Sequence, residues 1–145
     1  MAKAHSNLAH DAIAALAKHV PNLMVVTQNV DDLHERAGSE HVVHLHGSLQ
    51  HARCFACARS HDLAECTSLS RSGSYVEPPR CTHCNGKIRA GVVWFGEALP
   101  EAELKSALKH AQSCDLLLSV GTSGRQERYI RQHISPSSLA NMART

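Results

Sequence analysis

Four of the six cysteines stand in two Cys-x-x-Cys pairs, and this pattern constrains the fold more than any other feature of the chain. The first pair is Cys54 and Cys57, the second is Cys81 and Cys84, and residues 58–80 separate them. A tight turn that carries Cys-x-x-Cys can offer two thiolates to one metal ion, and zinc takes four such sulfurs at about 2.3 Å. We therefore expect these four cysteines to hold one structural Zn2+ in a small zinc-ribbon module.

Two disulfides or a redox-active Cys-x-x-Cys are the alternatives, and they fit the sequence less well. Charged and histidine side chains interrupt residues 1–20, so no apolar core of a secretory signal is present there, and we expect a reducing, cytoplasmic location. A redox pair would begin a helix within a βαβ unit, whereas these pairs lie in polar, turn-rich sequence. Cys66, His61 and His83 are rival zinc ligands, although none repeats the pairwise spacing.

The composition indicates one domain with a modest, mostly aliphatic core. The chain has 145 residues, of which 43% are hydrophobic and 3% aromatic. A formal net charge of +2 gives no basis for direct binding to nucleic acid. No apolar run reaches the roughly 20 residues that cross a bilayer, so we expect no membrane partner.

Apolar periodicity predicts that helices alternate with buried strands. Pro21 and Gly38 mark the ends of two expected helices, and the expected strands are continuous apolar runs, as in parallel sheets covered on both faces. The helices are expected at 8–20, 31–37 and 100–111, and the strands at 23–27, 42–45 and 116–120. This pattern predicts an α/β fold: a partial Rossmann-like parallel sheet with helices on both faces, plus the inserted four-cysteine zinc-ribbon module.

Polar residues follow two of the expected strands, at the sheet edge where open α/β folds bind ligands. Gln28, Asn29 and Asp31 follow the first strand, and the triplet 121–123 follows the last. Their amides, carboxylate and hydroxyls can hydrogen-bond to a ribose or a carboxamide. Taken singly, such residues are more often helix caps or loop residues.

Taken together, these residues resemble the sirtuins, a family of NAD-dependent protein lysine deacylases. The resemblance covers about residues 2–123. Two segments, NVDDLHER at 29–36 and VVWFGE at 92–97, are most similar to the bacterial and mitochondrial branch that includes desuccinylases. The matching segments, in the family's order, are TQNVDDLH at 27–34, AG at 37–38, HLHGS at 44–48, the two cysteine pairs, VVWFGE at 92–97 and GTS at 121–123. The resemblance implies an NAD-binding domain at 1–50 and 88–124 and a zinc-binding module at 51–87.

The resemblance also implies the roles of individual residues. His46 would be the general base that takes a proton from a ribose hydroxyl after the acyl oxygen has displaced nicotinamide, and Asn29 would be catalytic beside it. An imidazole suits this role because its ordinary pKa, about 6.5, leaves it largely neutral near pH 7. His44 is the main competitor, since residues two apart on a strand share a face. The implied NAD-binding residues are Gln28, Asn29, Val30, Asp31, Gly121, Thr122 and Ser123, and those implied to bind an acyl-lysine peptide are Val93, Trp94, Phe95, Gly96 and Glu97.

Two features depart from the family pattern. The sequence has no glycine-rich strand and turn of the kind that cradles dinucleotide phosphates. We therefore expect an exposed sheet edge, weak NAD affinity and, as further partners, a complementing fragment or a chaperone. Residues 125–145 are polar and match no part of the family, so a divergent, poorly ordered tail is expected there.

Three functions are compatible with this sequence. The first is an NAD-dependent protein lysine deacylase of the deacetylase or desuccinylase type, which transfers the acyl group to ADP-ribose and releases nicotinamide. The alternative is a catalytically inactive sirtuin remnant that serves as a zinc-containing peptide-binding module. A zinc-ribbon interaction module unrelated to deacylation is the third, and the ordered matches outside the zinc region oppose it.

Overall fold

The structure is a computed structural model that describes residues 4–62, 71–72, 75–121 and 143–144, with only the backbone described at 71–72, 75–76 and 143–144. Contacts along the chain divide it into two units, Met1–Leu99 and Pro100–Thr145. Each unit is described by itself. In the described part of the chain, no helix is long and apolar enough to cross a membrane.

The first helix, α1 (Leu8–Leu16), begins at a side-chain cap. The Asn7 side chain accepts hydrogen bonds from the amides of Ala9 at 3.0 Å and His10 at 3.2 Å, which satisfies amides that have no partner inside the helix. The helix is shorter than the predicted 8–20, because residues 17–20 continue as turns before Pro21.

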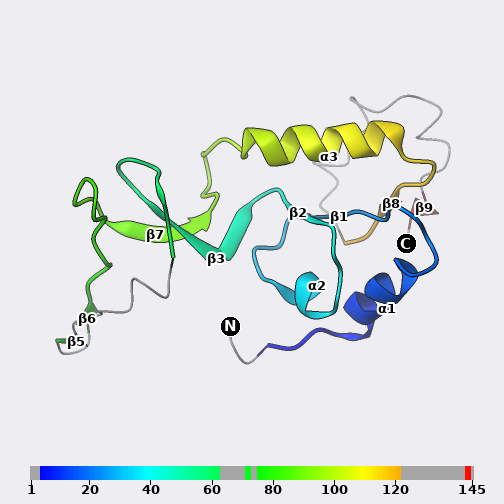
Figure 1. Cartoon of the computed structure of the whole chain (residues 1–145), viewed down its shortest axis with the longest axis horizontal. Coiled ribbons are helices and arrows are strands. Elements are labelled where there is room, and N and C mark those ends of the chain that lie inside the picture. The colour runs from blue at the N-terminus through cyan, green and yellow to red at the C-terminus, as the bar shows by residue number, and fades with distance from the viewer. Residues whose placement is uncertain (1–3, 63–70, 73–74, 122–142, 145) are drawn as a thin grey trace. The chain divides into compact units, whose positions relative to one another are not determined.

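A short β-α-β unit follows α1 (Figure 1). Strand β1 (Val25–Thr27) pairs in parallel with β2 (Val42–His44), and α2 (Leu33–Arg36) lies between them in sequence. The Asp31 carboxylate accepts the amide of Leu33, the first residue of α2, at 3.1 Å. Gly38, with φ of +100°, follows the end of α2. The predicted parallel pairing of the first two strands is confirmed.

A three-stranded antiparallel sheet carries the cysteine pairs. Its order is β4 (Ser60–His61), β3 (Gly47–Cys54) and β7 (Ile88–Val92). The buried core beside it consists of Ala52, Cys54, Cys81 and Ile88. Two two-residue strands, β5 (Arg71–Ser72) and β6 (Tyr75–Val76), form a separate antiparallel pair.

Gly47 is the point where the parallel unit passes into the antiparallel sheet. Its φ is +72°, and a Cβ atom there would collide with the backbone carbonyl oxygen of Gly91 on β7. Glycine is therefore needed both for the backbone conformation and for the close approach of β3 to β7. The sheet also extends beyond the predicted zinc module at 51–87. Strand β3 starts before it, at Gly47, and β7 starts after it, at Ile88.

The second unit contains α3 (Glu101–Ser113), β8 (Leu118–Ser119) and β9 (Ala143–Arg144). The two strands pair in parallel. The predicted helix at 100–111 is confirmed, and the predicted strand at 116–120 is reduced to two residues. The predicted disorder of residues 125–145 falls almost wholly outside the described residues.

Candidate functional site

The four cysteines converge on one point, although they come from two separate turns. Their sulfur atoms all lie within 4.8 Å of one another. The Sγ atoms of Cys54 and Cys84 are 3.4 Å apart, and those of Cys57 and Cys81 are 3.8 Å apart. A tetrahedral zinc with bonds of about 2.3 Å separates its sulfurs by about 3.8 Å. The donor set therefore fits one zinc ion, and the sulfurs are too far apart for disulfides.

The two cysteine turns share one backbone geometry. The residue after the second cysteine of each pair, Ala58 or Asn85, has a φ of +58°. Its amide donates to the carbonyl of the first cysteine of the pair, at 3.0 Å for Cys54 and 2.8 Å for Cys81. Each turn thus curls its two sulfurs toward the same side.

Backbone amides favour the thiolate form of two of the four cysteines, Cys54 and Cys81, whereas, despite the Gly86 amide, the neighbouring sulfurs raise the pKa of Cys84 to about 12. Hydrogen bonds from the amides of Cys57 and Ala56 outweigh burial and lower the pKa of the Cys54 thiol to about 6. The amides of Cys84 and His83 similarly lower the pKa of the Cys81 thiol. A thiolate is the form that ligates zinc, so this environment supports the structural site.

The rival ligands do not displace any of the four sulfurs. His61 makes a side-chain hydrogen bond to Cys81, and the backbone of His83 donates to the same sulfur. Among the described residues, the only group of potential ligands that could hold a metal ion consists of the four cysteines. Cys66 lies outside the described residues.

His46 lies in the turn between β2 and β3, and its ring is fixed by the loop that follows β1. Its Nδ1 atom is 3.0 Å from the carbonyl oxygen of Gln28. A carbonyl can only accept, so Nδ1 carries the proton and donates it, and Nε2 carries the lone pair of the neutral ring. A general base needs such a lone pair, held in a defined direction.

Three chain segments meet at His46. The ring of His46 contacts the carbonyl of Gln28, the residue after β1, and the carbonyl oxygen of His46 accepts the amide of Val93 at 2.8 Å. Three residues farther on, the amide of Leu49 donates to the carbonyl of Val30 at 2.8 Å. The structure therefore brings the implied cofactor loop, the implied base and the start of the implied peptide segment together.

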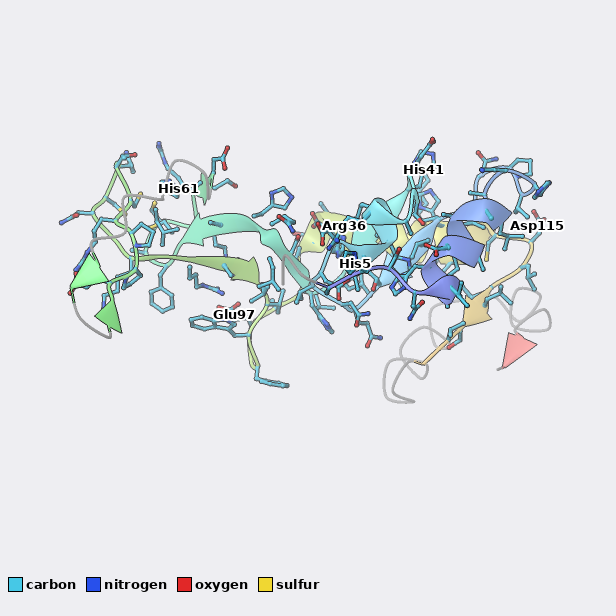
Figure 2. All side chains as sticks on the ribbon, turned by 90° about the horizontal axis from the view of Figure 1, so that it is seen from below. His5, Arg36, His41, His61, Glu97 and Asp115 are labelled. Carbon is cyan, nitrogen blue, oxygen red and sulfur yellow. The ribbon has the colours of Figure 1, made fainter. Side chains whose placement is uncertain are left out.

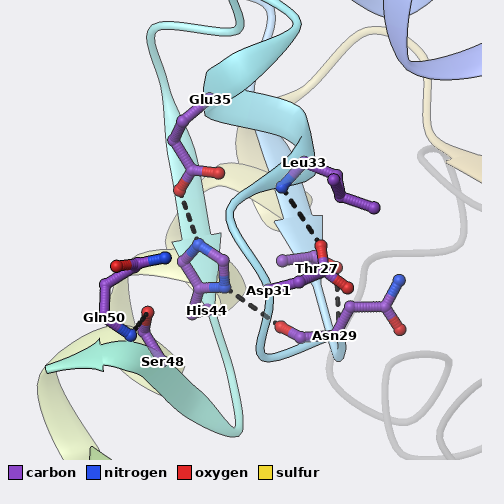
Figure 3. A network of polar contacts seen from close by, with 8 residues as sticks. All are labelled: Thr27, Asn29, Asp31, Leu33, Glu35, His44, Ser48 and Gln50. Atoms are coloured by element: carbon purple, nitrogen blue, oxygen red, sulfur yellow. Dashed lines mark hydrogen bonds and ion pairs between the residues drawn. The ribbon is translucent and has the colours of Figure 1, made fainter. Parts of the chain in front are cut away.

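His44, the competitor for the role of base, has both ring nitrogens engaged (Figure 3). Nδ1 lies 3.0 Å from the carbonyl oxygen of Asn29, and Nε2 lies 2.6 Å from a carboxylate oxygen of Glu35. Both partners are acceptors, so the ring satisfies both contacts when it is an imidazolium. Against the effect of burial, Glu35 and the Asn29 carbonyl raise the pKa of His44. A ring without a lone pair cannot take a proton, which favours His46 as the base.

The implied cofactor-binding residues differ in their surroundings. The Asn29 side chain is exposed, whereas its amide donates to Thr27 Oγ1 at 3.1 Å. One oxygen of Asp31 is used by the amide of Leu33. Gly121 has a φ of +62° and lies after β8, in the second unit. Thr122 and Ser123 lie outside the described residues.

The implied peptide segment, 93–97, forms a turn that an ion-pair cluster holds in place. The Glu97 amide donates to the Trp94 carbonyl at 3.0 Å, with Gly96 at φ +88° between them. The Glu97 carboxylate binds Arg53 at 2.8 Å and Arg89 at 2.5 Å, and it accepts the Trp94 amide at 3.0 Å. Hydrogen bonds from Arg89 and from the Trp94 amide lower the pKa of Glu97. Glu97, labelled in Figure 2, therefore shapes this turn.

The two aromatic residues of the turn lie at the surface. The guanidinium carbon of Arg89 is 4.2 Å from the centre of the Trp94 ring, a cation–π contact on one face of an indole that is 49% exposed. Phe95 is fully exposed.

Sequence reasoning missed Arg53, Arg89 and Glu35 as contributors to this site. Arg53 and Arg89 face each other in the β3–β7 register, which only the strand pairing reveals.

Comparison with known proteins decides the family. A model of the Sir2 family matches residues 1–127. The chain belongs to the Sir2 family. NAD-dependent protein deacylase 1 of Pseudomonas aeruginosa is 60% identical over 119 residues, which are 81% of this chain and 48% of that protein. An NAD-dependent protein deacylase of Pyrococcus furiosus is 46% identical over 122 residues, or 84% of this chain and 48% of the relative.

Solved sirtuin structures share the fold. A mutant Sir2 homologue in complex with ADP-ribose is 36% identical, with a TM-score of 0.71 over 90% of this chain and 53% of that one. A Sir2 protein bound to a propionylated peptide is 34% identical, with a TM-score of 0.72 over 83% of this chain and 50% of that one. The chain thus spans about half the length of the relatives that it matches.

Proposed function

We propose that this sirtuin chain belongs to an NAD-dependent protein lysine deacylase, a transferase that moves the acyl group of a modified lysine to ADP-ribose and releases nicotinamide. The observation that carries the proposal is the His46 ring, held by the Gln28 carbonyl at 3.0 Å so that the lone pair of the neutral imidazole is on Nε2. The names of the curated relatives, NAD-dependent protein deacylases at up to 60% identity, support the same reaction.

In this proposal each element of the site has a separate task. NAD, when bound, supplies the ribose that receives the acyl group, with nicotinamide as the leaving group. His46 takes a ribose hydroxyl proton at Nε2. Asn29 assists at the same ribose, and the side chains of Gln28, Val30 and Asp31 hold the cofactor. Gly121, Thr122 and Ser123 are proposed as a second set of NAD contacts.

The peptide substrate is proposed to lie along residues 93–97. Trp94 and Phe95 present apolar surface, and the backbone of this segment can pair with an extended peptide as an added strand. The solved structure with a propionylated peptide supports acyl-lysine peptides as the substrate class. The Arg53–Glu97–Arg89 cluster would hold the segment in the required shape.

The zinc ion has a structural role in this proposal. Four cysteine thiolates fill a tetrahedral coordination sphere, so no position is left for a reactive water. We propose an NAD-binding part at 1–50 and 88–124, a zinc module at 51–87 and a divergent tail at 125–145. We also propose a cytoplasmic location, where reduced thiolates persist.

Nicotinamide release in the presence of NAD and acetyl-lysine or succinyl-lysine peptides tests the function. We expect release that depends on the acylated peptide and is lost with the unmodified peptide. Release from neither acyl peptide, together with saturable peptide binding, would instead favour the inactive peptide-binding remnant, for which the exposed Trp94 and Phe95 would suffice.

A further inference from the structure

Three consecutive carbonyl oxygens of the loop after β1, those of Gln28, Asn29 and Val30, accept hydrogen bonds from the segment 44–49. The donors are the His46 ring at 3.0 Å, the His44 ring at 3.0 Å and the Leu49 amide at 2.8 Å. The backbone of the loop is therefore anchored at every residue from 28 to 30. Two of these anchors are histidine rings, and only the His44 ring also contacts a carboxylate, that of Glu35.

The His44 anchor depends on a charged ring (Figure 3). A neutral imidazole has one N–H group, so it can donate either to the Asn29 carbonyl or to the Glu35 carboxylate, but not to both. Both contacts are short, at 3.0 Å and 2.6 Å, and the His44 side chain is only 15% exposed. The bridge between α2 and the loop therefore exists only while His44 carries its second proton.

The charges around His44 favour that second proton. Burial lowers the pKa of His44, but the hydrogen bonds to Glu35 and to the Asn29 carbonyl, with the negative charges of Glu35 and Asp31, raise it above the ordinary value. The neighbouring His34 opposes this shift only when it is charged. Its own pKa is lowered, first by burial and then by His10.

We propose that His44 is a positioning residue whose imidazolium, held between Glu35 of α2 and the Asn29 carbonyl, fixes the loop at 28–31 beside His46 and releases it when the ring loses a proton. This proposal rests on the proposed function, because that loop is the implied NAD-binding segment. Release would raise the concentration of NAD needed for half-maximal rate without removing the base. Cofactor affinity would then fall as the pH rises through the folded-state pKa of His44.

The first test needs no catalysis. Nitrogen NMR of the histidine rings should show His44 protonated on both nitrogens with a midpoint above about pH 6.5. Glu35→Gln should lower that midpoint, whereas the control Glu40→Gln, at an exposed glutamate, should leave it unchanged. Hydrogen-exchange protection of the Asn29 amide should fall above the midpoint. A His44 midpoint at or below pH 6.5, or one that Glu35→Gln does not move, would overturn the proposal.

The second test separates positioning from chemistry. His44→Phe keeps a ring of similar size but removes both donors, and His44→Gln keeps one donor. We expect His44→Phe to raise the KM for NAD about tenfold at pH 7, the size expected for loss of a charge-assisted hydrogen bond, with a smaller change in kcat. His44→Gln should recover part of the loss. The control His41→Gln, at an exposed histidine labelled in Figure 2, should behave as wild type.

The outcomes of the two tests keep the proposals distinct. A fall in kcat with unchanged KM in His44→Phe would place His44 in the chemical step and contradict a positioning role. If the wild-type protein turned over no acyl peptide, the proposed function would fail, while the NMR titration and the exchange of the Asn29 amide would still decide the role of His44. Equal amide protection at residues 28–31 in wild type and in His44→Phe would overturn that role.

Discussion

At the residue scale, the acceptors that surround two neighbouring histidines give them different chemistry. The Nδ1 atom of His46 donates to the Gln28 carbonyl, whereas the His44 ring lies between two acceptors, the Asn29 carbonyl and the Glu35 carboxylate. The same side chain can therefore be a base in one position and a cation two residues earlier. The proposed roles of the two histidines therefore follow from the environment of each ring.

Gly47, which follows His46 directly, lies where the backbone conformation and the approach of β7 require glycine. We expect Gly47→Ala to lower the free energy of unfolding by about 3 kcal/mol, because an alanine is strained at φ +72° and its Cβ would push β3 away from Gly91. Chemical denaturation measures this change.

Gly96→Ala is the matched control for that substitution. Gly96 also has a positive φ, +88°, but a Cβ atom there would meet nothing within 4 Å. The expected cost is about 1 kcal/mol, from backbone strain alone. Equal costs at the two positions would show that contact with β7 does not matter at Gly47.

At the scale of elements, the β4–β3–β7 sheet depends on the four-cysteine site and an ion-pair cluster more than on an apolar core. Its buried apolar cluster consists of two cysteines, one alanine and one isoleucine. Such a cluster buries too little surface to fold a β-sheet by itself. The cysteine turns and the arginine–glutamate contacts across β3 and β7 therefore carry much of its stability.

Removal of one zinc ligand should unfold the module. Structural zinc contributes about 10 kcal/mol or more in small zinc domains, so we expect Cys54→Ser to lose bound zinc and the cooperative thermal transition of the module. Cys114→Ser, outside the cluster, is the control and should retain both. Mass spectrometry of the native protein and circular dichroism measure the two properties. Native zinc content in Cys54→Ser would contradict a four-cysteine site.

The Glu97 cluster should make stability depend on acid pH. The folded-state pKa of Glu97 is lowered by Arg89, so the contribution of this group is present above its ordinary pKa, about 4.5, and is lost as the pH falls through the lower folded value. The difference in unfolding free energy between wild type and Glu97→Gln should therefore shrink below about pH 4.5. Urea unfolding at several pH values measures it.

An exposed ion pair provides the comparison for the Glu97 cluster. Glu101 pairs with Lys105 on the surface of α3, where both side chains are more than 70% exposed. Glu101→Gln should change stability little at any pH, because solvent screens such pairs. A constant difference between wild type and Glu97→Gln from pH 3 to 7 would mean that the Arg53 and Arg89 contacts do not shift the titration of Glu97.

At the scale of the whole molecule, local patterns in the sequence were enough for the family, the parallel strand pair and the cysteine site. Each of these is indicated by short motifs, such as the spacing within each cysteine pair or the apolar run that becomes β1. The antiparallel sheet was missed because β3, with the sequence GSLQHARC, is polar and lacks regular alternation. The Arg53–Glu97 and His44–Glu35 pairs depend on strand pairing and helix placement, which single positions do not reveal.

Several expectations remain predictions at this scale. The weak NAD affinity, the complementing fragment or chaperone and the poorly ordered tail are not tested by the described residues. The chain spans about half the length of its curated relatives, so the NAD site of the whole protein is also a proposal. Calorimetric titration with NAD would measure the affinity directly.

The central claim is that His46 acts as the base on a ribose hydroxyl after nicotinamide has left. The most direct measurement is a single turnover of His46→Ala with NAD and an acyl-lysine peptide, in which nicotinamide and acyl-ADP-ribose are quantified separately. We predict that nicotinamide is still released, whereas acyl transfer to ADP-ribose falls by about 10²–10⁴-fold, the usual contribution of a general base. Acyl transfer at the wild-type rate in this variant would contradict the account.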